Sequence, residues 1–136
     1  MDGNLTLDEL YAAANEMCRK WWGVDYTGTI RLTNVNWRRR EACFAHTTDK
    51  RVQEIRMSRK VNARFTREYV LGNLLHELVH WRLFTQGIPH MDDDPEFVRE
   101  CIRVGAPFSH TKKAQYAAKL HGGAANHGAN HTLSQR

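Results

Sequence analysis

The stretch REYVLGNLLHELVHWRLFTQG, Arg67 to Gly87, decides how this chain folds, because it combines a strong helical pattern with several polar side chains. Its large apolar residues recur at intervals of three and four positions: Val70, Leu71, Leu74, Leu75, Leu78 and Val79. Together they cover a face too wide for a helix on the protein surface. The pattern therefore predicts a buried central helix that ends near Gly87.

Two further helices are predicted before and after this central helix. The first spans Leu7 to Trp22, with Thr6 and Glu9 forming a capping box at its start. The other follows Asp94, an N-cap residue with a proline directly after it, and ends at Gly105, where a C-cap glycine is expected. Both apolar stripes are suited to packing against a common core.

Three short segments between the first helix and the central helix have the alternation typical of strands. They are TGTIRLTN (27–34), EACFAHT (41–47) and VQEIRMS (52–58), and residues 47–50 fit a turn between the last two. We therefore expect an α+β fold, in which a small antiparallel sheet packs with the N-terminal helix, the central helix and the helix that follows it.

The length of 136 residues allows one proper core, so we expect a single domain over residues 1–121. Residues 111–120 read as a last short helix, and residues 122–136, rich in His, Gly and Asn, as a disordered tail. No run of residues is long and apolar enough for a membrane span. The three cysteines include no CxxC pair, which indicates reduced thiols. A cytoplasmic monomer is expected.

The positive charge of the chain is concentrated in one segment. The net charge is +5, but residues 31–67 alone contain eleven Lys/Arg and three acidic residues. Such a segment is a candidate for sequence-independent contact with DNA, although charge runs also form ordinary solvated surfaces. The expected nucleic-acid contacts are Trp37, Arg38, Arg39, Arg40, Arg59 and Lys60.

The central helix contains the pattern HExxH, formed by His76, Glu77 and His80. A spacing of four residues places both imidazoles on one helix face, where they can hold one Zn²⁺ ion. Glu77 is adjacent without being a ligand, and a carboxylate beside a zinc-activated water is the hydrolytic pair of metalloproteases. We therefore predict a zinc site with Glu77 as general base.

Three residues compete for the third ligand position. Glu100 follows His80 by twenty residues, the placement of the glutamate ligand in thermolysin-like enzymes. Asp93 lies just before the next helix, and His90 lies in the loop between. The spacing alone does not choose among them.

In order along the chain, these motifs resemble the SprT-like zinc metalloprotease domain. The matching pieces are IRMS (Ile55–Ser58), LLHELVH (Leu74–His80), PHMDDDPEF (Pro89–Phe97) and RVGAP (Arg103–Pro107). They span roughly residues 24–107, most of the expected domain. The resemblance implies a small zincin-like fold and a peptidase that acts on proteins associated with or crosslinked to DNA.

Two departures from the family pattern matter. The family places a histidine ligand directly before its PEF element, where this chain has Asp93 and Asp94. If the Pro-His pair of this chain is aligned with that of the family, His90 becomes the third ligand. If the chains are aligned on Phe97, the third ligand is Asp93. His90 is favoured, because three histidines suit zinc better than two histidines and an aspartate. The C-terminal zinc ribbon of the family is also missing, so any DNA affinity would have to come from residues 31–67.

The sequence thus predicts a zinc metallopeptidase with a protein substrate. A rival of another class is a non-catalytic nucleic-acid-binding or inhibitory protein whose zinc site is structural. A closed site with four ligands, for example both His90 and Asp93, would favour this rival, because catalysis needs an open position. Glu77 favours the enzyme, because a structural site has no need of it. A metal-dependent hydrolase acting on another bond is a weaker alternative.

Overall fold

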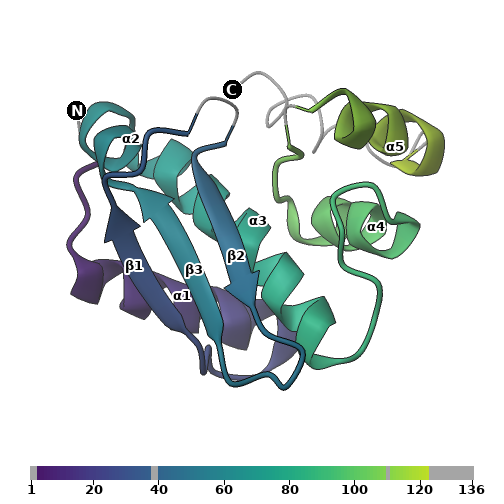
Figure 1. The fold of residues 1–136 in the computed structure, drawn as a ribbon, viewed down its shortest axis with the longest axis horizontal. Coiled ribbons are helices and arrows are strands. Elements are labelled where there is room, and N and C mark those ends of the chain that lie inside the picture. Colours follow the sequence, from purple (N-terminus) through teal and green to yellow (C-terminus); the bar gives the residue numbers. More distant parts are fainter. Residues whose placement is uncertain (1–2, 38–39, 110, 123–136) are drawn as a thin grey trace. The chain divides into compact units, whose positions relative to one another are not determined.

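The computed structural model describes residues 3–37, 40–109 and 111–122 and has an α+β fold (Figure 1). Its elements, in chain order, are α1 (Leu7–Trp22), β1 (Thr29–Thr33), β2 (Ala42–His46), β3 (Gln53–Ser58), α2 (Arg59–Arg64), α3 (Arg67–Thr85), α4 (Pro95–Val104) and α5 (Lys112–Gly122). The chain divides into two compact units, Met1–Leu78 and Val79–Arg136, with the boundary inside the continuous helix α3. The predicted tail, apart from Gly122, lies outside the described residues.

The sheet of the first unit is mixed, with the strand order β1-β3-β2. β2 and β3 pair antiparallel, with Phe44 opposite Ile55, and the predicted turn between them is present. β1, in contrast, runs parallel to β3, with Ile30 opposite Ile55. The expectation of an antiparallel sheet is therefore wrong for this pair. β3 lies between β1 and β2 in the sheet and runs in the same direction as β1.

Helix α1 has the predicted bounds and caps. The Glu9 N–H donates to the Thr6 hydroxyl at 3.1 Å, and the Thr6 N–H donates to the Glu9 carboxylate at 2.9 Å. At the other end Gly23 has φ of 66°, a left-handed conformation that favours glycine, and its N–H bonds back to the last turn. The capping box and glycine cap are confirmed, as are the Asp94 and Gly105 positions at the two ends of α4.

The core of the first unit lies between one face of the sheet and the helices α1 and α3, which pass behind the sheet in Figure 1. The buried side chains come from all three layers: Leu10, Ala14 and Cys18 of α1, Ile30, Ile55 and Met57 of the sheet, and Val70, Leu74 and Leu78 of α3. Because alternate strand residues point to opposite faces, the sheet has a second face that carries polar side chains.

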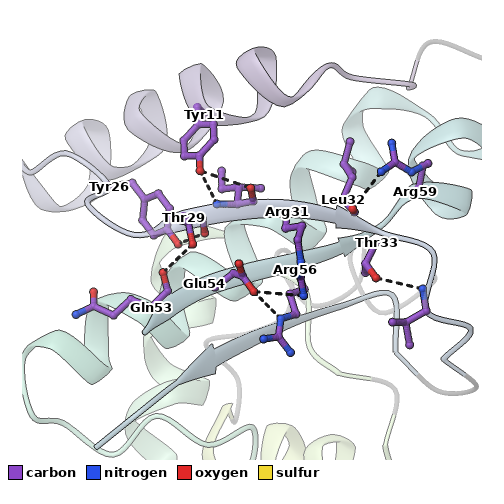
Figure 2. Close-up of polar contacts among 12 residues, drawn as sticks. Tyr11, Tyr26, Thr29, Arg31, Leu32, Thr33, Gln53, Glu54, Arg56 and Arg59 are labelled. Carbon is purple, nitrogen blue, oxygen red and sulfur yellow. Dashed lines mark hydrogen bonds and ion pairs between the residues drawn. The ribbon is translucent and has the colours of Figure 1, made fainter. Parts of the chain in front are cut away.

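Side chains close the outer edge of β1 (Figure 2). The Ile30 N–H donates to the hydroxyl of Tyr11 at 2.8 Å, and the Leu32 carbonyl accepts from Arg59 at 3.2 Å. The Tyr26 hydroxyl donates to the Thr29 carbonyl at 2.7 Å. An edge strand presents backbone groups that can pair with other chains, and these side chains occupy several of them.

The short helix α2 was not expected from the sequence. Ser58 caps it, accepting from the Val61 N–H at 3.1 Å. The buried side chain of Asn62 then holds the N-terminal segment, accepting from the Leu5 N–H at 3.0 Å and donating to the Leu5 carbonyl at 2.8 Å. The buried amide of Asn62 therefore has a partner for both its oxygen and its nitrogen, and these two hydrogen bonds hold the segment before α1 in place.

The second unit contains the end of α3 and the two last helices. α4 buries Phe97, Val98 and Cys101, and α5 packs on it. Ala114, Ala117 and Ala118 form the buried side of α5. No helix among the described residues is long and apolar enough to span a membrane.

Candidate metal centre

Helix α3 places polar side chains in the protein interior. Among the described residues, the buried polar side chains are those of Asn62, Asn73, His76 and Glu77, and three of these four belong to α3. His76 is 7% exposed and Glu77 6%. An ionisable group in an apolar interior is unfavourable by several kcal/mol unless it has partners. The interior of α3 is therefore arranged for interactions beyond packing.

His76 and His80 lie one helical turn apart on α3, as the HExxH spacing predicted. The Nε2 atom of His76 is 3.9 Å from the nearer carboxylate oxygen of Glu77. Both side chains are less than 10% exposed. Glu77 is therefore a buried carboxylate next to an imidazole.

The imidazole of His80 is fixed from three sides. Its ring stacks on Phe97, with centroids 4.1 Å apart and planes 19° from parallel. Its Nδ1–H donates to the backbone carbonyl of His90, and its Nε2 lies 2.9 Å from a carboxylate oxygen of Asp92. A hydrogen bond from Nδ1 to a carbonyl orients a histidine so that Nε2 can serve as a metal ligand.

Asp92 completes a group of three side chains that could hold a metal ion. One ligand atom each from His76, His80 and Asp92 lies within 4.8 Å of the other two. Two atoms that share one tetrahedral ion at about 2.0–2.1 Å are roughly 3.3 Å apart. The 2.9 Å between His80 and Asp92 is a few tenths shorter, as expected for a hydrogen bond that a metal would replace.

The three consecutive aspartates of the loop have three different roles. Asp92 faces His80, whereas Asp93 forms an ion pair with Lys113 of α5 at 3.1 Å. Asp94 accepts the Met91 N–H at 2.9 Å, which closes the loop just before α4. The loop is thus held by two of its carboxylates, and the third is directed towards the histidine.

Asp92, the third member of the group, was not among the three ligand candidates predicted from the sequence. Those candidates have other contacts. His90 contributes its backbone carbonyl to His80, and its ring makes edge contacts with His80 and Phe84. Glu100 is paired with Arg103 at 2.7 Å, and Asp93 with Lys113. The triple aspartate was the available signal, but only the path of the loop shows which carboxylate faces the histidines.

The charge of Glu77 also reaches the neighbouring strand β2. Burial raises the pKa of the Cys43 thiol above its ordinary value, and the negative charge of Glu77 raises it further. Arg40 and Arg56 oppose this rise in the Cys43 pKa. All three cysteines are free thiols.

The residues expected to contact nucleic acid are placed only in part. Arg38 and Arg39 lie outside the described residues, Trp37 is half-buried, and Arg40 and Lys60 are exposed. The guanidinium of Arg59 donates to the Leu32 carbonyl and to the Asn34 side chain, both at 3.2 Å. The guanidinium of Arg59 therefore stabilises the end of β1.

No protein-family model, no curated protein and no solved structure matches this chain. The resemblance to the SprT-like domain therefore rests on its motifs. The function has to be argued from the geometry of the group around α3.

Proposed function

We propose that this protein is a zinc-dependent hydrolase that cleaves peptide bonds. His76, His80 and Asp92 would hold the ion, and Glu77 would act as general base. The observation that carries the proposal is the convergence of the three ligand atoms within 4.8 Å, with a buried glutamate directly after the first of them. The same proposal includes three features that the motifs or the composition suggest. They are a zincin-like architecture, a cytoplasmic location and a protein substrate associated with DNA.

The donor set fits zinc. Two imidazole nitrogens and one carboxylate oxygen are the ligands of several catalytic zinc sites, which keep a fourth position open. The hydrogen bond of His80 to the His90 carbonyl leaves Nε2 on the side of Asp92, where a ligand nitrogen is needed. When bound there, zinc would lower the pKa of a water molecule and polarise a carbonyl oxygen.

Glu77 supplies the proton transfer that hydrolysis requires. Its carboxylate can accept a proton from the attacking water and pass it to the leaving amine. Its position in the helix, one residue after His76, keeps it close to the site without making it part of the ligand group. Burial excludes bulk water, which strengthens the interaction of its charge with the reacting groups.

The arrangement favours an enzyme over a structural zinc site. A structural site has four protein ligands, whereas the group among the described residues contains three. A structural site has no need of a carboxylate next to its ligands, whereas the buried Glu77 directly follows one of them. The non-catalytic rival therefore has less support, and the following experiment separates it from the enzyme.

The test compares zinc content with cleavage of an unfolded protein such as casein. Wild type should retain about one zinc per chain after dialysis and should cleave the substrate. Glu77→Gln should retain zinc but lose activity by about 100-fold to 10,000-fold, the usual contribution of a general base. Glu68→Gln is the matched control, because Glu68 lies on the same helix and is exposed.

Zinc without cleavage in wild type would support the structural rival. Equal losses of activity in Glu77→Gln and Glu68→Gln would show that Glu77 is not the base. A protein that binds no zinc would contradict both readings of the site.

A further inference from the structure

The two faces of the sheet differ in character. Ile30, Ile55 and Met57 point into the core and are 4% exposed or less. The residues that alternate with them point to the opposite face, away from the helices behind the sheet in Figure 1. This outward face carries charged side chains from two adjacent strands (Figure 2).

Three arginines form a row across the outward face. In the register of the sheet, Arg31 of β1 is opposite Arg56 of β3, and Arg56 is opposite Cys43 of β2. The positive charge of Arg40 lowers the pKa of the Cys43 thiol, so Arg40 lies near the β2 end of the row. With neighbouring strands about 4.8 Å apart, the row is roughly 10 Å long. We call Arg31, Arg56 and Arg40 the arginine row.

One carboxylate, that of Glu54, lies beside two members of the row. An oxygen of Glu54 lies 2.6 Å from Nε of Arg56 and 3.7 Å from Nη2 of Arg31 (Figure 2). The side chains of Arg31 and Arg56 are still 57% and 37% exposed, whereas that of Glu54 is 19% exposed. One negative charge thus faces two guanidiniums, which leaves positive charge in excess on this face.

The other acidic residues of the segment are engaged elsewhere. Asp49 accepts hydrogen bonds within the β2–β3 turn, from Thr47 and from the Arg51 N–H. Glu41 accepts the hydroxyl of Tyr69 and lies at the entrance to β2. Residues 31–67 contain eleven Lys/Arg and three acids, whereas the rest of the chain contains nine and twelve. The positive potential is therefore concentrated around the sheet.

We propose that the arginine row binds the sugar-phosphate backbone of a nucleic acid. Guanidinium groups bind phosphate through paired N–H donors, and contacts to the backbone are independent of base sequence. A line of guanidiniums across neighbouring strands matches a chain with one negative charge per nucleotide, because the cations and the phosphates both repeat at regular intervals. Trp37, in the connection leading to Arg40, is an aromatic residue of the kind that stacks on bases.

This inference shares Arg40 and Trp37 with the sequence prediction and differs from it in the other residues. Arg31 and Arg56 were not among the expected contacts, and Arg59, which was, is engaged at the edge of β1. The row also makes no use of the metal centre. The test of nucleic-acid binding is therefore independent of whether the protein is a hydrolase.

The test measures binding of a labelled thymidine oligonucleotide of about 20 nucleotides, longer than one binding site, by fluorescence anisotropy at several salt concentrations. Arg31→Gln and Arg56→Gln should each weaken binding about threefold to tenfold and flatten the salt dependence. Glu54→Gln should strengthen binding, because it removes the one negative charge in the row. Arg99→Gln, an exposed arginine of α4, is the control with the same change in net charge and should have little effect.

Amide chemical shifts provide a second measurement for any variant that folds poorly. The oligonucleotide should perturb residues of β1 and β3 in the wild-type protein. The proposal is overturned if wild type shows no salt-dependent binding, if Arg99→Gln weakens binding as much as Arg31→Gln, or if Glu54→Gln weakens it. Equal binding of an oligonucleotide and a poly-glutamate peptide at the row would also overturn the assignment to nucleic acid.

Discussion

The helix α3 and the outward face of the sheet use ionisable residues in opposite ways. On α3, His76 and Glu77 are almost completely buried, whereas on the sheet the side chains of Arg31 and Arg56 are 57% and 37% exposed. Burial makes an unpartnered charge unfavourable, so the polar groups of α3 require defined neighbours or a bound ion. Exposed charges are screened and contribute little to folding, so the arginine row can exist without a ligand. Ionisable residues thus indicate a specific site in one region and an electrostatic surface in the other.

The comparison predicts very different effects on stability. Leu74→Ala should lower the free energy of unfolding by about 2–5 kcal/mol, because Leu74 is fully buried on α3. Arg31→Gln should change it by less than about 0.5 kcal/mol. Urea unfolding followed by circular dichroism measures both. A large loss in Arg31→Gln would show that the arginine row is part of the folding core.

Removing ligand candidates sharpens the description of the buried site. Asp92→Ala should reduce zinc affinity by about 100-fold or more, because a ligand is lost. His90→Ala should have a much smaller effect, since the backbone carbonyl that orients His80 remains. Competition with a chelator measures the affinities, and Asp93→Ala serves as the neighbouring control. Zinc loss in His90→Ala with retention in Asp92→Ala would reverse the ligand assignment.

Salt should separate the two regions directly. For three contacts to a single-stranded backbone, raising NaCl from about 50 to 200 mM should weaken oligonucleotide binding roughly 20-fold. Zinc content should stay constant over this range, because coordination within the protein is hardly screened. Anisotropy and elemental analysis on the same samples measure the two quantities. Parallel losses would mean that the two regions are not independent.

The smallest effect is expected at Cys43, which both regions influence. Glu77 raises the pKa of its thiol, and Arg56 lowers it. Because the thiolate is the reactive form, Glu77→Gln should speed alkylation of Cys43 by iodoacetamide near neutral pH, and Arg56→Gln should slow it. Peptide mass spectrometry follows Cys43, and the fully buried Cys18 and Cys101 serve as internal controls. Equal rates in all three proteins would contradict this electrostatic account.

Features set by neighbouring residues were predictable from the sequence. The capping box of α1, the proline start and glycine end of α4, and the HExxH face of α3 depend on side chains a few positions apart. The direction of β1 was not predictable, because alternation identifies a strand but not its partner. Nor was the short helix α2, whose formation is supported by contacts of Asn62 with a distant part of the chain.

The two proposed sites show the same limit. His76, Glu77 and His80 were predicted because one helix fixes their spacing. Asp92 was missed because three adjacent aspartates have the same local chemistry, and their hydrogen bonds with other residues distinguish them. Of the arginine row, Arg40 was an expected contact, whereas Arg31 and Arg56 come together only through the register of β1 and β3.

The insertion of β3 between β1 and β2 has a consequence for the order of folding. The β2–β3 hairpin pairs Phe44 with Ile55, residues eleven positions apart, whereas the β1–β3 pair joins Ile30 to Ile55 across twenty-five. Closing the shorter loop loses less chain entropy, so the hairpin should form first and β1 should dock on it afterwards. Arg31 meets Glu54 and Arg56 only in that last step. Oligonucleotide binding would then report, during refolding, the moment at which the sheet is complete.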